Sequence, residues 1–332
     1  MNKYELMLLS MSLSATILTG ILVIIRKTVR NRLSHTIRYY SWLPVLFRAL
    51  LPFASGGAWL NRIFRQYYET SNYYVKPMVF GEEGRQIIIG SNVHAPALQS
   101  HDRFTLLMIL WLLVAVGLLI KKITAYRSFY KYIRAGWQPV ESPELLDILG
   151  DICKKMNINQ RIDLCINPLI SSPLLLGIMK PVIVLPAIPQ HPDLLYYILT
   201  HELVHHKRRD IVLIWLTQLT LCVHWFNPLF YLIRRQAAKD RELSCDEQVI
   251  KGLTDQDKIT YGRTLLETFI QNGSYQEHDV TSALLENKSL LRIRLEAIET
   301  DRESPANRFW TGAVFLVLGL SFLVLGVYTP AA

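Results

Sequence analysis

The sequence predicts a mainly α-helical membrane protein with about four transmembrane helices and one large hydrophilic block. Of its 332 residues, 51% are hydrophobic and only 19% are charged, and the mean hydropathy is +0.20. The apolar residues gather in near-continuous runs about as long as a helix needs to cross the hydrocarbon core. This composition excludes an ordinary soluble enzyme, an intrinsically disordered chain and a disulfide scaffold.

The excess positive charge lies beside the apolar runs. The net charge is +9, with a pI of about 9.3. Basic residues next to a span mark the cytoplasmic side, whereas a nucleic-acid face would collect them on one soluble helix. We therefore expect contact with membrane lipid and none with nucleic acid. The two clusters are Arg26, Lys27, Arg30 and Arg32, and then Lys121, Lys122, Arg127, Lys131 and Arg134.

Three uncharged runs predict transmembrane helices: Leu6–Ile25, Phe104–Ile120 and Phe309–Val327. The first run is not a cleavable signal peptide, because it is too long for an h-region and no A-x-A site follows it. A fourth span over His35–Phe53 contains two arginines, and charge inside a bilayer is costly. Only if this segment crosses do both basic clusters become cytoplasmic, so we expect it to cross.

These spans divide the chain and place both termini outside the cell. The four cysteines form no CxxC pair and lie on the cytoplasmic side, so we expect them to be reduced. The predicted parts are two transmembrane helices within 1–53, an extracellular loop at 54–103, a transmembrane helix at 104–120, a cytoplasmic domain at 121–308, a transmembrane helix at 309–328 and an extracellular stub at 329–332.

The apolar segment Ile211–Ile233 is a special case. It is long enough to span, but Asn227-Pro228 interrupts it, and proline removes a backbone donor and bends a helix. Basic residues flank both of its ends. We therefore predict a membrane-associated or re-entrant segment without a net crossing.

Within the cytoplasmic domain we predict a mixed α+β arrangement. Pro173–Pro186 is either an edge strand that pairs with a substrate strand or an ordinary buried hairpin. The expected helices are Ser142–Met156, Asp193–Arg208 and Arg234–Lys251, and the expected strands are Ile162–Ile166 and Val182–Leu185.

A zinc motif stands out in this domain. In His201-Glu202-Leu203-Val204-His205 the two histidines share one face of a helix, so both imidazoles can bind one ion. Glu202 can reach the open side of that ion and act as general base on a water. The alternative is an amphipathic helix with two solvated histidines.

The third zinc ligand is expected downstream. Glu242 is favoured because hydrolytic zinc sites commonly combine two histidines with a glutamate, and Cys245 is the alternative. Asp246 lies on the same helical face as Glu242 and could support a ligating histidine. Both carboxylates could also belong to an exposed acidic face. Asp210 either supports His205 or pairs with a neighbouring arginine.

Together these residues resemble the BlaR/MecR-type antirepressor metallopeptidases, which are transmembrane signal transducers for β-lactam antibiotics. The resemblance covers essentially the whole chain. It is carried by the spans at both ends, Pro173, Gly177, Lys180-Pro181, Ile183-Val184-Leu185-Pro186, His201–His205, Lys207–Asp210, Trp225-Phe226-Asn227-Pro228 and Glu242–Glu247.

The resemblance implies a gluzincin-type zinc protease domain within 121–308. One Zn²⁺ per chain would be held by His201, His205 and Glu242, with Glu202 as general base. It also implies an external penicillin-binding sensor after the last span. The chain contains no acylating S-x-x-K followed by K-T-G, so a sensor would have to follow Ala332, or this member responds to another signal.

The resemblance further implies self-cleavage and proteolytic relief of a cytoplasmic transcriptional repressor, which induces antibiotic resistance. The expected substrates are thus the chain itself and the repressor, and a homodimer is compatible with this interpretation. The matching stretch for self-cleavage is Gln271–Ser289, within which we hypothesise a cut at Ala283–Leu284. Alternatively, the leucines there are core positions of a helix.

Two other functions fit the motif. One is a housekeeping membrane metalloprotease of the HtpX type, which shares the His/His/Glu site. The other is a non-catalytic receptor scaffold with structural zinc. The intact Glu202 disfavours the scaffold, because a structural site fills its fourth position and needs no base.

Overall fold

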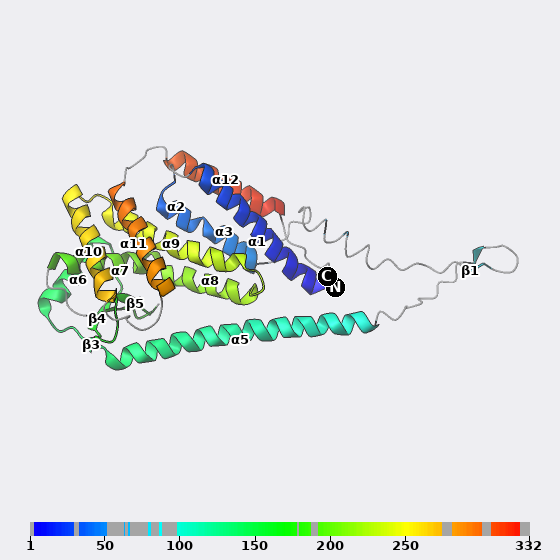
Figure 1. Ribbon diagram of the computed structural model, residues 1–332, viewed down its shortest axis with the longest axis horizontal. Helices are drawn as coiled ribbons and strands as arrows, with labels where there is room; N and C mark the ends of the chain where they lie inside the picture. Colours follow the sequence, from blue (N-terminus) through cyan, green and yellow to red (C-terminus); the bar gives the residue numbers. More distant parts are fainter. Residues whose placement is uncertain are drawn as a thin grey trace.

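The computed structural model describes residues 3–29, 33–51, 98–177, 179–186, 192–273, 281–300 and 307–325, together with short pieces at 63, 66, 79–80 and 86–87. Most of the predicted extracellular loop 54–103 and all of the stub 329–332 lie outside these residues. The protein is mainly helical, and the order of its helices can be followed by colour in Figure 1.

Two described helices are long and apolar enough to cross a membrane. They are Tyr4–Thr28 within α1 (Lys3–Thr28) and Thr105–Gly136 within α5 (Leu98–Gly136). The helix α12 (Asn307–Leu325) carries a shorter apolar stretch. The helix α5 continues well past the predicted end at Ile120, because no proline or glycine interrupts the basic and aromatic segment before Gly136.

The segment His35–Phe53 does not form the single continuous helix that the predicted fourth span required. Its described part forms α2 (His35–Tyr40) and α3 (Trp42–Leu50), which are separated at Ser41. The carbonyl oxygen of Arg38 would accept from the next turn of a continuous helix. Instead it accepts hydrogen bonds from the Ser41 hydroxyl, at 2.7 Å, and from the guanidinium of Arg26 on α1. These two side chains compete for that carbonyl oxygen at the point where α2 and α3 separate.

The segment Ile211–Ile233 folds as a helical hairpin. The helix α8 (Asp210–Val223) and the helix α9 (Leu229–Ile250) run antiparallel around a turn at 224–228 (Figure 1). At this turn the Asn227 side chain donates to Ser12 and Thr16 of α1, at 2.9 and 3.1 Å. The helix predicted at Arg234–Lys251 therefore begins earlier, directly after Pro228.

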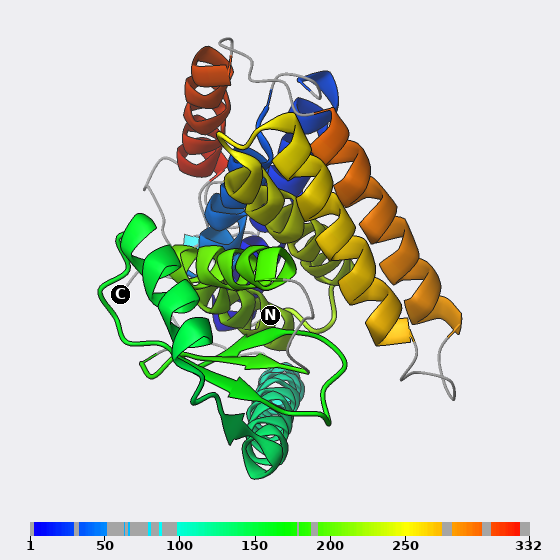
Figure 2. The same ribbon diagram turned by 90° about the vertical axis from the view of Figure 1, so that its left-hand side faces the viewer.

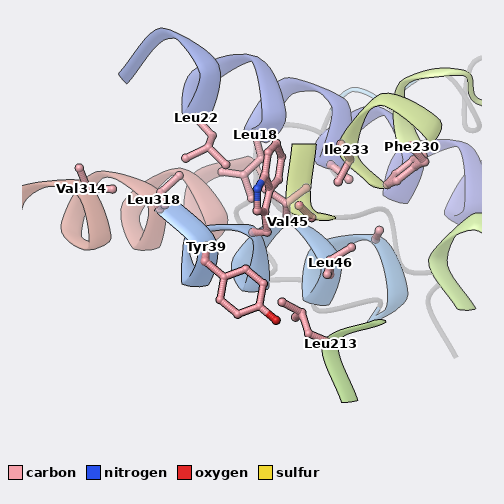
Figure 3. Close-up of a cluster of buried hydrophobic side chains, with 14 of the residues drawn as sticks. Leu18, Leu22, Tyr39, Val45, Leu46, Leu213, Phe230, Ile233, Val314 and Leu318 are labelled. Carbon is pink, nitrogen blue, oxygen red and sulfur yellow. The ribbon is translucent and has the colours of Figure 1, made fainter. Parts of the chain in front are cut away.

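One apolar cluster joins these helices. Figure 3 shows side chains of α1, α2, α3, α8, α9 and α12 that meet between the helices. The buried members include Leu18, Leu22, Tyr39, Val45, Leu46, Leu213, Phe230, Ile233, Val314 and Leu318. The α8–α9 hairpin is thus part of the same bundle as the N-terminal helices.

Next to this bundle lies a four-stranded sheet with the strand order β3-β4-β6-β5. The strand β6 (Val182–Leu185) pairs parallel with β4 (Asp163–Ile166) and antiparallel with β5 (Leu174–Leu176), while β3 (Gln138–Pro139) closes the opposite edge. All four residues of β6 are buried. The strand β5 lies at an edge, so one of its sides is not paired within this sheet.

Helices flank this sheet and carry the candidate site. The helices α6 (Pro143–Lys155) and α7 (Pro192–Arg208) share a buried apolar cluster with β4 and β6. The helices α10 (Asp255–Gly273) and α11 (Thr281–Glu299) run side by side and pack against α7 and α9 (Figure 2). The mixed α+β arrangement expected for residues 121–308 is present in the described part of that range.

Candidate metal centre

The two histidines of the motif meet over one face of α7. Their Nε2 atoms are 3.1 Å apart, and the planes of the two rings are nearly perpendicular, at 87°. The helix α9 brings the Glu242 carboxylate to the same point. Its Oε2 atom lies 3.5 Å from His201 Nε2 and 3.8 Å from His205 Nε2. Three donor atoms from two helices therefore form a small triangle.

The triangle has the dimensions of a zinc site. A tetrahedral Zn²⁺ with arms of about 2.0–2.1 Å separates its ligand atoms by about 3.3–3.4 Å, and the observed separations bracket this value. Two imidazoles and a carboxylate also form a common donor set of catalytic zinc, which leaves the fourth position open. The residues present thus fit the ion that the motif implies.

Cys245 is the other candidate for the third ligand. Its thiol can form a metal-binding group with His201 and His205, because suitable atoms of the three residues lie within 4.8 Å of one another. However, Cys245 Sγ lies 3.5 Å from Nδ1 of His201, whereas the triangle uses the Nε2 atom of that ring. Since Tyr261 already occupies this Nδ1 atom, the geometry favours Glu242.

Asp210 supports His205. Its Oδ2 atom lies 2.6 Å from His205 Nδ1, and Arg208 Nη2 lies 3.2 Å from the same oxygen. The two roles considered from the sequence therefore coexist, with Arg208 as the arginine. A carboxylate on the far nitrogen of a metal-binding histidine fixes its orientation and raises its basicity.

Asp246 supports His201 indirectly. The separation between Asp246 Oδ1 and His201 Nδ1 is 3.6 Å, too long for the direct hydrogen bond expected from the sequence. The Tyr261 hydroxyl fills the gap, because it donates to Asp246 at 2.6 Å and lies 2.8 Å from His201 Nδ1. Asp246 also accepts two hydrogen bonds from Arg294 of α11, one on each carboxylate oxygen and both at 2.7 Å.

The charges around Glu242 keep it ionised. Burial alone would raise the pKa of Glu242, but the nearby imidazoles of His201 and His205, at 3.5 and 3.8 Å, hold that pKa well below its usual range. Arg241 donates to the other oxygen of Glu242 at 2.9 and 3.1 Å. Burial would likewise lower the pKa of His201, yet contacts with Cys245 and Glu242 raise it to about 9. A carboxylate that stays charged is ready to bind a cation.

Glu202 faces open space beside the triangle. It lines two cavities, of about 370 and 990 Å³, together with His201 and Glu242. The smaller cavity lies between α7 and the α10–α11 pair, and the larger extends along β5 toward α5 and α8. The larger cavity is therefore bordered by the edge strand, by Glu202 and by all three residues of the triangle.

Several residues that contact the site could not be identified from the zinc motif of the sequence. Tyr39, Arg241, Tyr261 and Arg294 reach the site from α2, α9, α10 and α11. The predicted cut at Ala283–Leu284 falls in the first turn of α11, where the backbone is helical.

Known proteins are similar to this chain. The sequence pattern of the BlaR1 peptidase M56 family matches residues 6–298. The regulatory protein BlaR1 of Bacillus licheniformis is 30% identical over 191 residues, which is 56% of this chain and 32% of that protein. The methicillin resistance mecR1 protein of Staphylococcus aureus is 24% identical over 308 residues, which is 90% of this chain and 51% of that protein. The chain thus spans about a third to a half of the length of these curated relatives.

Proposed function

The chain belongs to the BlaR1 peptidase M56 family, and on this premise we propose that it is an integral membrane zinc endopeptidase that transduces an external signal by proteolysis. The observation that carries the proposal is the triangle of His201 Nε2, His205 Nε2 and Glu242 Oε2, with Glu202 beside it. This arrangement combines a complete ligand set with a free carboxylate, and a structural zinc site would not need that carboxylate.

The chemistry is peptide hydrolysis. His201, His205 and Glu242 would hold the zinc ion, which would supply Lewis acidity toward a peptide carbonyl and a water molecule. Glu202 accepts a proton from the attacking water and returns it to the leaving amine. Asp210 and Tyr261 keep the two imidazoles in place, and Arg241 keeps the third ligand ionised.

Substrate is held as an extended strand along β5. Peptidases that add a substrate strand to a sheet edge take affinity from backbone hydrogen bonds, and β5 offers such an edge next to the site. The two cavities on either side of Glu202 provide room for side chains on both sides of the cut. Within Pro173–Pro186, β5 and the buried strand β6 form a hairpin, and its β5 half supplies the edge for a substrate strand.

The membrane arrangement comprises four crossings, with the peptidase domain in the cytoplasm and both termini outside. The exposed apolar surface of α5 supports this arrangement, because Leu106, Leu110 and Leu113 are 64%, 56% and 65% exposed. The α8–α9 hairpin enters from the cytoplasmic side and returns, because its turn contacts the middle of α1. In this arrangement α2 and α3 together make the second crossing.

The signal is a β-lactam, and the response is self-cleavage followed by cleavage of a cytoplasmic repressor. The relatives named as BlaR1 and methicillin resistance proteins support this assignment. A cut at Ala283–Leu284 requires the first turn of α11 to unwind, because a strand bound along β5 is extended and a helix is not. Self-cleavage is therefore coupled to local unfolding at the start of α11.

The proposal is tested with the full chain in detergent or vesicles. We expect about one zinc per chain by metal analysis, and fragments on either side of the cut by mass spectrometry. Glu202→Gln should keep the zinc and abolish the fragments, while Glu299→Gln on α11 should change neither. Fragments formed equally by Glu202→Gln would reject autoproteolysis, and a chain without zinc would reject the enzyme.

A further inference from the structure

The N-terminal helices touch the support of the metal centre through one side chain. The Tyr39 hydroxyl on α2 donates to Asp210 Oδ1 at 2.9 Å, and Asp210 Oδ2 lies 2.6 Å from His205 Nδ1. Tyr39 and Asp210 are only 2% and 3% exposed. Two hydrogen bonds therefore connect α2 with an imidazole of the metal triangle.

The contact is well defined on both sides of the carboxylate. The ring of Tyr39 belongs to the apolar cluster of the bundle, while its hydroxyl points toward α8 (Figure 3). The Arg208 guanidinium lies over this ring, 4.6 Å from its centre, and also contacts Asp210 Oδ2 at 3.2 Å. Each oxygen of Asp210 thus has its own partners, and Tyr39 is the partner of Oδ1. Loss of that hydrogen bond would free the carboxylate to rotate away from His205.

The helix α2 is also tied to the helix that carries the third ligand. Glu247 of α9 accepts hydrogen bonds from the backbone amides of His35 and Thr36, at 3.1 and 2.7 Å, and from the Thr36 hydroxyl at 2.6 Å. Glu247 lies a little over one turn after Glu242. A movement of α2 relative to α8 and α9 would therefore displace both Asp210, which supports His205, and the helix that carries Glu242.

We propose that Tyr39 is a positioning residue for the metal centre and acts through Asp210 on His205. By this path the position of the N-terminal hairpin, formed by α1 and α2–α3, would affect the zinc affinity of the site. The inference rests on the proposed zinc site. It assigns to α2 a role in function that is separate from crossing the membrane. A signal that displaces the hairpin formed by α1 and α2–α3 would change how firmly His205 is held.

The experiment measures zinc affinity rather than turnover. The full chain carrying Glu202→Gln, which blocks self-cleavage, is purified in detergent and titrated with zinc against a chromophoric chelator. Changes in residues that support a metal ligand typically cost about 10–100-fold in affinity, and we expect Tyr39→Phe to fall in this range. The matched control is Tyr40→Phe, which removes a hydroxyl from the neighbouring position of the same helix and should change affinity less than about twofold by comparison.

A double-mutant cycle separates positioning from general loss of structure. Asp210→Ala should weaken zinc binding by itself, and Tyr39→Phe should add almost nothing in the Asp210→Ala background, because its path to His205 is already cut. Equal affinities of the parent and Tyr39→Phe would overturn the inference and leave the zinc enzyme intact. So would full additivity of the two changes. A parent chain that binds no zinc would refute both proposals.

Discussion

Arg294 and Asp246 form a two-point ion pair in which Nε and Nη2 of the arginine each lie 2.7 Å from a carboxylate oxygen. The same guanidinium lies 3.7 Å from Oε2 of Glu242. The side chains of Arg294 and Asp246 are 14% and 2% exposed, so the pair is largely withdrawn from water. Through this pair α11, whose first turn contains the predicted cut, contacts the candidate metal centre.

Removal of the Arg294 charge should destabilise the protein. Arg294→Met leaves the buried Asp246 carboxylate without its cationic partner, and breaking such a pair costs about 3–5 kcal/mol. Arg294→Lys keeps the charge but loses the two-point geometry, so its unfolding temperature should lie between those of the parent and Arg294→Met. The midpoint of thermal unfolding in detergent measures both. If Arg294→Met unfolds at the parent temperature, the ion pair does not contribute to stability.

The third zinc ligand can be identified by replacing each of the two candidates with alanine. Glu242→Ala should lower zinc affinity by more than about 100-fold, beyond the range that is typical of supporting residues. Cys245→Ala should keep one zinc per chain, because its sulfur lies on the Nδ1 edge of His201. Metal analysis after dialysis against a weak chelator distinguishes them. The opposite pattern would assign the site to His201, His205 and Cys245.

The Tyr261 hydroxyl should matter for catalysis although it does not touch the triangle. Tyr261→Phe leaves His201 Nδ1 and Asp246 Oδ1 too far apart to bond directly, at 3.6 Å. We expect about a 10–100-fold loss of cleavage rate or zinc affinity, as for other partners of metal-binding histidines. Tyr196→Phe on α7 is the control and should match the parent. An unchanged Tyr261→Phe would mean that Asp246 does not act through this hydroxyl.

The turn of the α8–α9 hairpin should contribute to the stability of the bundle. Asn227 donates to two side chains of α1 and accepts from the backbone amide of Leu229, at 3.0 Å. Asn227→Ala should lower the free energy of unfolding by about 1–3 kcal/mol, because the buried Ser12 and the half-buried Thr16 each lose a hydrogen bond. Hydrogen exchange should rise at 224–228. Gln236→Ala, on an exposed position of α9, should do neither.

The helices and strand around the site could be predicted from local sequence patterns, because each of these elements depends on the spacing of residues within one segment. The motif of α7 places its histidines one turn apart wherever that helix packs. The strand Val182–Leu185 and the helices around Pro143 and Arg208 were confirmed for the same reason. The choice of Glu242 over Cys245 came from zinc chemistry, and the arrangement of α7 and α9 supports it.

Contacts between distant segments could not be read from the sequence. Tyr39 is 171 positions from Asp210, and Tyr261 is 60 positions from His201, so no short pattern connects them. The break at Ser41 was missed because hydropathy does not register the competition of Arg26 and Ser41 for a single carbonyl oxygen. Asp246 was expected to bond a ligating histidine directly, and no pattern indicated that the Tyr261 hydroxyl lies between Asp246 and His201.

The position of Arg294 also bears on how a signal would end. A cut at Ala283–Leu284 would leave Arg294 and α12 on one fragment, and Glu242 and Asp246 on the other. The peptidase would then be a non-covalent complex of two pieces, and its working lifetime would be their residence time. Both pieces retain apolar helices, so the bilayer would keep them at a high effective concentration. Termination would then depend on fragment dissociation and degradation rather than on depletion of metal.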